Sequence, residues 1–156
     1  MSERIEELSA RLAALEAKVA ELRDEALIRT RSLQIVDEKD AVRAAIGVGG
    51  DGVVRFVQTD AKGAVRIGLA VGADGKPGLA FFDEKKAARV ELGLSPTDEP
   101  ALSLSDERET VRLQARVHAD GRVGLMAFDA GGQLRAVLGA SADGKGAIGT
   151  FDGSAP

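Results

Sequence analysis

The feature that most constrains the fold of this chain is an aspartate that recurs every 23 residues. It stands at Asp37, Asp60, Asp83, Asp106, Asp129 and Asp152. An arginine follows six residues after each of the first five, at Arg43, Arg66, Arg89, Arg112 and Arg135. The chain therefore contains about five and a half copies of one internal repeat. Such a repeat predicts a stack of similar structural units.

Each copy alternates apolar and polar residues with a period of two, which is typical of β-strands. The second copy, for example, places Val65, Ile67, Leu69 and Val71 at alternate positions. We expect a short strand before each aspartate, a four-residue turn after it, and then a longer strand. The pattern predicts an antiparallel β-meander of about eleven strands over residues 32–152.

A second turn signal is Asp-Gly, eight residues after the arginine in four copies. We expect three-residue hairpin loops there, such as Ala73-Asp74-Gly75, with the glycine in the left-handed conformation. The third copy departs from this pattern and has the segment 95–100, Ser-Pro-Thr-Asp-Glu-Pro, in its place.

Pairing each aspartate with the residue five later sets the strand register and makes one sheet face almost wholly apolar. It puts Leu79 opposite Leu92 and Phe81 opposite Val90. Exposure of such a face to water is unfavourable, so we expect neighbouring copies of the chain to cover it. Three sheets around a threefold axis would form a β-prism. The alternative is one chain that closes its sheet into a barrel or a superhelical solenoid.

The segment 1–31 reads as a helix with a heptad pattern of apolar residues, which is typical of a coiled coil. Arg11 and Glu16 bracket a short motif that resembles the trimer-specifying motif of parallel coiled coils, although a dimer stays open. A helix packed on its own domain is the other interpretation. The residues expected to mediate oligomerisation are Ile5, Leu8, Arg11, Leu12, Leu15, Glu16, Val19 and Leu22, with Ala26 continuing the seam.

The other sheet face carries the arginines. One interpretation is an anion-binding face made of Arg66, Arg89, Arg112 and Arg135. The other is a solvated surface on which each arginine lies over neighbouring phenylalanine rings and pairs with glutamates. The expected glutamate partners are Glu84, Glu91 and Glu107, and the residues expected to leave room are Gly47, Gly68, Gly93 and Gly139.

No catalytic, metal or cofactor site is predicted. The aspartates precede turns, so we expect them to accept hydrogen bonds from turn N–H groups rather than to bind calcium. The segment 47–52 matches G-x-G-x-x-G, but no helix follows to complete a phosphate site. With no cysteine and one histidine, His118, no nucleophile arrangement stands out. We therefore do not expect an enzyme.

Composition narrows the partners and the compartment. The net charge of −4 gives no general attraction to nucleic acid or to anionic lipid. No apolar run reaches the roughly 20 residues that span a bilayer, and no signal peptide is apparent. We expect a cytoplasmic protein by default, with export or association with a virion left open. The segment 153–156 is expected to be a disordered tail.

Two features resemble known families. Phe82-Asp83 and the segment 128–135 resemble YD repeats of the RHS type, in which an aromatic-Asp pair precedes Gly-Arg-Leu. The order of coiled coil and β-repeats is similar to trimeric phage fibres and adhesins, and to uncharacterised bacterial repeat proteins. These resemblances imply a β-rich, fibre-like protein.

The leading functional hypothesis is a self-associating structural or scaffold protein that forms an elongated homotrimeric rod. Its main partner would be itself, with an unidentified protein or glycan as a further partner. The alternative is a fibre-tip or lectin-like binding module that holds an anionic ligand on the arginine face.

Overall fold

The computed structural model describes residues 2–24 and 30–153 and divides the chain into two units, 1–31 and 32–156. The first unit contains one helix, α1 (Ser2–Asp24). The second contains eleven strands, which pair antiparallel with their sequence neighbours. These are β1 (Ser32–Val36), β2 (Val42–Val48), β3 (Val54–Thr59), β4 (Val65–Val71), β5 (Pro77–Phe82), β6 (Ala88–Leu94), β7 (Pro100–Ser105), β8 (Val111–Val117), β9 (Val123–Phe128), β10 (Leu134–Ala140) and β11 (Gly146–Thr150).

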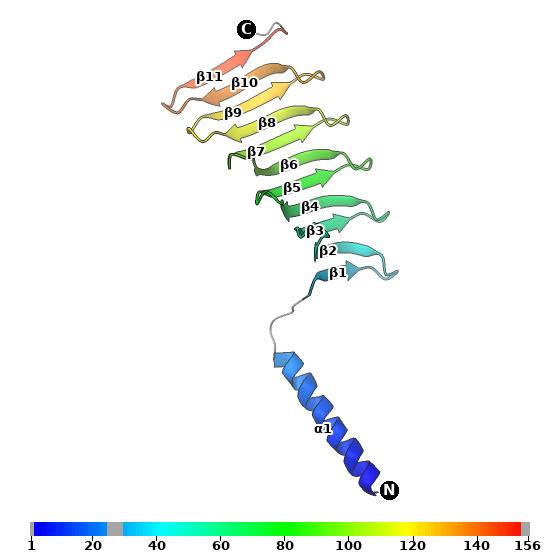
Figure 1. Ribbon diagram of the computed structural model, residues 1–156. Coiled ribbons are helices and arrows are strands. Elements are labelled where there is room, and N and C mark those ends of the chain that lie inside the picture. Colours follow the sequence, from blue (N-terminus) through cyan, green and yellow to red (C-terminus); the bar gives the residue numbers. More distant parts are fainter. Residues whose placement is uncertain (1, 25–29, 154–156) are drawn as a thin grey trace. The chain divides into compact units, whose positions relative to one another are not determined.

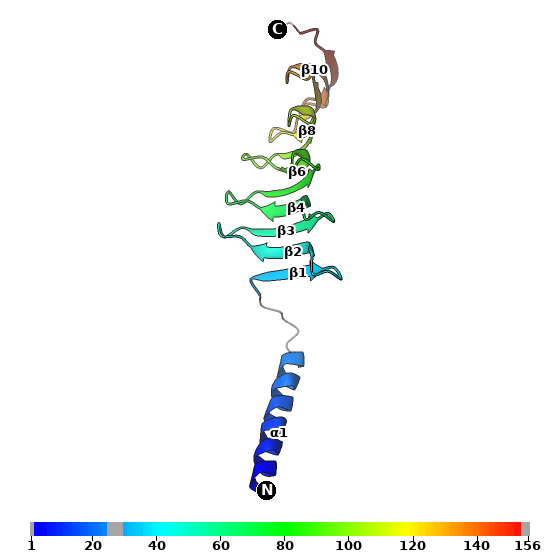
Figure 2. The same ribbon diagram turned by 90° about the vertical axis from the view of Figure 1, so that its right-hand side faces the viewer.

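The strands form one sheet whose spatial order is the order of the sequence, from β1 to β11 (Figure 1). Within the described residues each strand contacts only the strands next to it, so the sheet is a single layer. The view in Figure 2 shows that the strands change direction along the sheet, as expected for a twisted sheet. The predicted mainly β fold, with one N-terminal helix and an antiparallel meander, is confirmed.

All the hairpins have three-residue loops whose last residue is left-handed. In the Asp-Gly loops this residue is the glycine, as predicted; Gly75 has φ of 79°. In the third copy Asp98 takes this place with φ of 62°. The loops after the repeated aspartates have the same form, since the N–H of Asp83 donates to the carbonyl of Ala87 at 3.0 Å. The predicted four-residue turn is therefore wrong by one residue.

A β-bulge in each copy compensates for this shorter turn. Phe81 lies opposite Val90 as predicted, but Phe82 lies opposite Ala88. Arg89 is therefore the extra residue of the bulge, with no residue opposite it on β5. The same shift occurs beside each repeated arginine from Arg43 to Arg135. The pairing of each aspartate with the residue five later is thus wrong at the turn, although the register beyond the bulge is correct. Bulges re-aim side chains, and here the re-aimed residue is the arginine.

Two of the glycines on the arginine face allow the backbone of the adjacent strand to approach closely. A Cβ on Gly93 would lie 2.7 Å from the carbonyl oxygen of Pro77, and one on Gly139 would lie 2.7 Å from that of Val123. A backbone oxygen cannot move aside as the end of a side chain can. At these two positions the carbonyl of the adjacent strand requires glycine, and the idea that glycine leaves room for arginine stays a prediction.

The left-handed backbone of Lys86 is a candidate for a stabilising substitution. Its φ is 69°, and the equivalent position in other copies is occupied by Gly63 and Gly132. We expect Lys86→Gly to raise the free energy of unfolding by roughly 0.5–1 kcal/mol, since glycine relieves the left-handed strain but frees the unfolded chain. Thermal denaturation measures this effect. Lys85→Gly, one residue earlier in the same loop, should instead be neutral or destabilising, and an equal gain there would contradict the explanation.

Candidate functional site

One face of the sheet presents an unbroken central column of apolar side chains. Each strand contributes one residue, and each lies directly opposite the next. The central column consists of Leu33, Ile46, Phe56, Leu69, Leu79, Leu92, Leu102, Ala115, Leu125, Leu138 and Ile148. Charged residues are absent from it because the alternation of each copy directs them to the other face.

Most of the central column is exposed to a degree that large apolar side chains rarely reach in a folded domain, while Phe56, Leu79, Leu102 and Ala115 are partly buried. Leu92 is 50% exposed and Leu138 is 51% exposed. The residues beside the column repeat this, including Val48, Val71 and Val117. A contiguous apolar patch of this kind marks an interaction site.

The chain has almost no core to stabilise it alone. Among the described residues the buried hydrophobic side chains are those of Ala44, Val53 and Ala87. The accessible surface is 11840 Å² for a mass of 16.2 kDa, whereas a compact monomer of this mass exposes about 7,400 Å². The single chain therefore exposes roughly 4,400 Å² more than a compact monomer of its mass would.

Helix α1 carries a second exposed apolar surface, which we call the heptad seam. Its described members, Ile5, Leu8, Leu12, Leu15 and Val19, are between 49% and 61% exposed. Arg11 and Glu16 also lie on the exposed helix surface. The side chain of Leu22 and the whole of Ala26 lie outside the described part of the chain.

The repeated aspartates organise the turns that follow them. In each copy Oδ1 accepts hydrogen bonds from the N–H groups two and four residues later. For Asp106 these donors are Arg108 at 2.9 Å and Thr110 at 3.2 Å. The same bonds occur at Asp37, Asp60, Asp83 and Asp129. The prediction that these aspartates serve turn geometry is confirmed.

The second carboxylate oxygen of each of these aspartates pairs with the arginine at the bulge. Nη1 of Arg89 lies 3.2 Å from Oδ2 of Asp83, and Nε of Arg135 lies 2.7 Å from Oδ2 of Asp129. Arg66 lies farther away, 3.8 Å from Asp60. The prediction of glutamate partners is wrong, because the aspartate of the same copy lies closer and Glu107 pairs with Lys85 at 3.4 Å.

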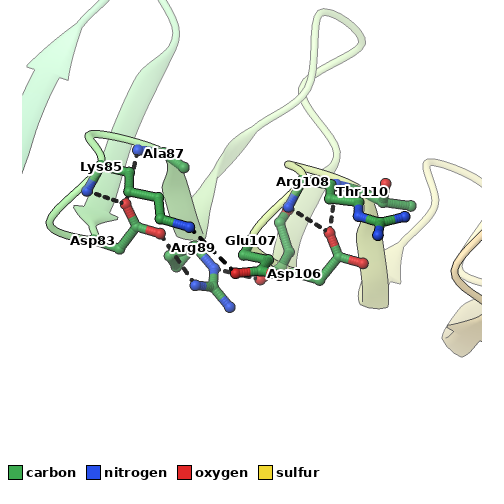
Figure 3. Close-up of polar contacts among 9 residues, drawn as sticks. Asp83, Lys85, Ala87, Arg89, Asp106, Glu107, Arg108 and Thr110 are labelled. Atoms are coloured by element: carbon green, nitrogen blue, oxygen red, sulfur yellow. Dashed lines mark hydrogen bonds and ion pairs between the residues drawn. The ribbon is translucent and has the colours of Figure 1, made fainter.

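Four of these arginines, all but Arg66, also donate a hydrogen bond to a backbone carbonyl of the next copy. Nε of Arg89 donates to the carbonyl of Ser105 at 2.8 Å, and Nε of Arg112 donates to that of Phe128 at 2.9 Å. Figure 3 shows the aspartate arrangement in two consecutive copies, with Lys85 reaching Glu107. We call the repeated pairing the Asp–Arg ladder. Its arginines, including Arg66, Arg89, Arg112 and Arg135, are each about 35–42% exposed; anion binding by them stays a prediction.

The Asp–Arg ladder predicts sensitivity to acid. Turn N–H groups, and then the arginines, hold the pKa of Asp37 and Asp106 below the usual value. Carboxyls with a lowered pKa stabilise the fold fully above the unfolded pKa of about 3.9. That stability is lost as pH falls from there through the folded pKa. We expect the melting temperature to be steady near neutral pH and to fall below about pH 4.

The control for this acid effect is Asp106→Asn, which keeps an oxygen acceptor for the turn but cannot titrate. Its melting temperature should depend less on pH below about pH 4 than that of the unaltered protein. An unchanged acid dependence in chains that lack several ladder carboxyls would contradict this explanation.

The third copy holds an ionic cluster that sequence reasoning missed. Oε1 of Glu99 accepts a hydrogen bond from the N–H of Ala119 at 3.1 Å and lies 3.5 Å from Nδ1 of His118. Its Oε2 lies 3.8 Å from Arg116. The N–H of Ala119, followed by the side chains of His118 and Arg116, keeps the pKa of Glu99 low even though burial opposes this. The departure of the segment 95–100 from the repeat pattern was the available signal.

The glycine-rich segment that matches G-x-G-x-x-G lies at a turn of the sheet. The segment 47–52 covers the end of β2 and a β-hairpin loop, which is closed by a hydrogen bond from the N–H of Gly49 to the carbonyl of Val53. In the described residues no three of the His, Asp or Glu side chains are grouped to hold a metal ion. Over the same residues no helix is long and apolar enough to cross a membrane.

Comparisons with known proteins do not assign a family. No protein-family model matches the chain, and no curated protein matches it. Among solved structures it is similar to a point mutant of S. aureus TarM in complex with Fondaparinux, alpha-GlcNAc-glycerol and UDP. The identity is 11% and the TM-score is 0.41, over 85% of this chain and 23% of TarM. A match at this level carries no argument about function.

Proposed function

We propose that this protein is a structural protein that assembles with copies of itself into an elongated homotrimeric rod, and that it is not an enzyme. The observation that carries the proposal is the exposed central column on a sheet that has almost no core of its own. At about 25 cal/mol per Å² of apolar surface, burial of the central column between copies would stabilise an assembly far more than the few small buried side chains stabilise one chain.

A parallel arrangement of three copies would bury both exposed apolar surfaces, the heptad seam and the central column. The heptad seam of α1 pairs with other helices in a coiled coil, and Arg11 with Glu16 favours three strands. Parallel helices would deliver three sheets on the same side of the bundle, with their central columns facing one axis. The Asp–Arg ladder would then lie on the outer faces, where partly exposed ion pairs cost least.

Cysteine cross-linking tests the parallel arrangement, since the chain has no cysteine of its own. Leu33→Cys and Leu138→Cys place one thiol near each end of the central column. In a parallel, in-register assembly each variant should cross-link to itself under a short bifunctional maleimide. In a face-to-face antiparallel dimer the two variants would cross-link only when mixed. The opposite-face variant Gln34→Cys is the control and should cross-link weakly.

A further inference from the structure

A third surface for association lies at the end of the sheet, on strand β11. Among the described residues, β11 pairs with β10 and with no other strand. The N–H of Phe151 donates to the carbonyl of Arg135, and the N–H of Ser141 donates to the carbonyl of Lys145. The backbone N–H and carbonyl groups of the odd-numbered residues of β11 therefore point toward β10. By the alternation of antiparallel ladders, the backbone groups of Gly146, Ile148 and Thr150 point to the free edge.

Within its described residues, strand β11 lacks the devices that usually prevent strand pairing. It contains no charged residue and no proline, and its pairing with β10 is free of the bulge found on the aspartate side of the hairpins. Ile148 is 81% exposed, more than any other large apolar side chain of the described residues. Natural edge strands are normally protected by charge, proline or a bulge. An unprotected edge is therefore a pairing surface.

We propose that the free edge of β11 pairs antiparallel with the β11 of a second copy of this chain, joining two assemblies end to end. A twofold axis through Ile148 sets it opposite itself and Gly146 opposite Thr150, so all three free-edge residues find partners. An axis perpendicular to the sheet keeps both apolar faces on the same side. The central column would then continue without a break from one copy into the next.

The ends of β11 add complementarity in this register. Lys145, whose side chain is 83% exposed and whose ammonium lies 2.9 Å from Asp143 of its own chain, would lie opposite Phe151 of the second copy. An ammonium group near a ring face is attracted to it. Any shift by two residues along the strand would lose one of the backbone pairs and this contact. The inference does not depend on the proposed trimer, because any basic unit with a free β11 could double.

Mass in solution over a range of concentrations tests the proposal. We expect the basic unit to double as concentration rises, because a single strand pair buries little surface and binds weakly. Thr150→Pro removes a donor from the free edge while leaving the bonds to β10, and it should abolish the doubling. Gln34→Pro makes the same change on the outer edge of β1 and should leave the doubling intact. Doubling that persists in Thr150→Pro would overturn the proposal.

A second pair of variants, with opposite charges at position 148, tests the same strand pairing without introducing proline into β11. Ile148→Lys and Ile148→Glu each place like charges opposite one another on the axis and should each stay undoubled. Mixing the two variants should restore doubling; failure to restore it, with both variants folded, would overturn the strand pairing. The size of the basic unit separates this result from the proposed function. A trimer that never doubles rejects only the β11 pairing, and a monomer that doubles rejects only the trimer.

Discussion

Replacing Leu92 with glutamate is expected to break up the assembly and to lower the melting temperature by roughly 10 °C or more. Leu92 lies at the middle of the central column and is 50% exposed in the single chain. Burial of a leucine contributes about 1.5–3 kcal/mol, and a trimer would lose three such contributions. It would also gain three carboxylates in an apolar interior, where unpaired charge is strongly unfavourable.

The matched control for this substitution is Gln34→Glu, on the opposite face of β1. If the apolar face were in contact with water, both changes would be ordinary surface substitutions, each within about 0.5 kcal/mol of neutral. Light scattering and thermal denaturation of the two variants therefore give a direct contrast. Equal, small effects would mean that the central column is not buried in the working protein.

The second large effect is expected from Leu12→Glu in the heptad seam. Leu12 is 58% exposed on the single helix, but in a coiled coil three copies would meet at one level. Three glutamates there should prevent the helices from associating, because a buried like-charge cluster cannot be solvated. We expect the sheet unit to lose its parallel alignment and the protein to form smaller or irregular particles, as measured by light scattering.

Ala17→Glu is the control for the helix, since Ala17 lies outside the heptad seam and is also exposed. It changes helix propensity by only a few tenths of a kcal/mol and should leave the particle mass unchanged. A folded Leu12→Glu protein with the same mass as Ala17→Glu would contradict a role for the helix in assembly.

The sequence predicted the strand content and the faces well because a period of two fixes both together. A slip of one residue would have moved Leu79 and Leu92 from the apolar face to the polar one, so the register was strongly specified. The Asp-Gly loops were equally predictable, since glycine at Gly75 supplies the left-handed residue.

The turn after each aspartate was predicted one residue too long for a physical reason. The left-handed position is held there by Asp40, Lys86 and Glu109 as well as by glycine, so composition gave no clear signal. The bulge at each arginine is a backbone feature with no residue type of its own. Without it, the closeness of Arg89 to Asp83 could not be derived from the repeat spacing.

Contacts between charged side chains were the least predictable part of the surface. Several glutamates lie near the arginines in sequence, yet the carboxylate of Asp83 is oriented by two turn N–H groups and is therefore already in place for Arg89. The cluster around Glu99 depends on the proximity of β7 and β8 at one turn. Spacing along one strand does not report such contacts between strands.

The measurement that tests the central claim most directly is the absolute mass of the 156-residue protein in solution, followed on dilution until it no longer changes. The account predicts a limiting mass of three chains of 16.2 kDa, or about 49 kDa. It also predicts that a version beginning at Ser32 loses this defined size. A well-folded particle of a single chain mass would contradict the account, because a sheet with this apolar face would then be stable without a partner.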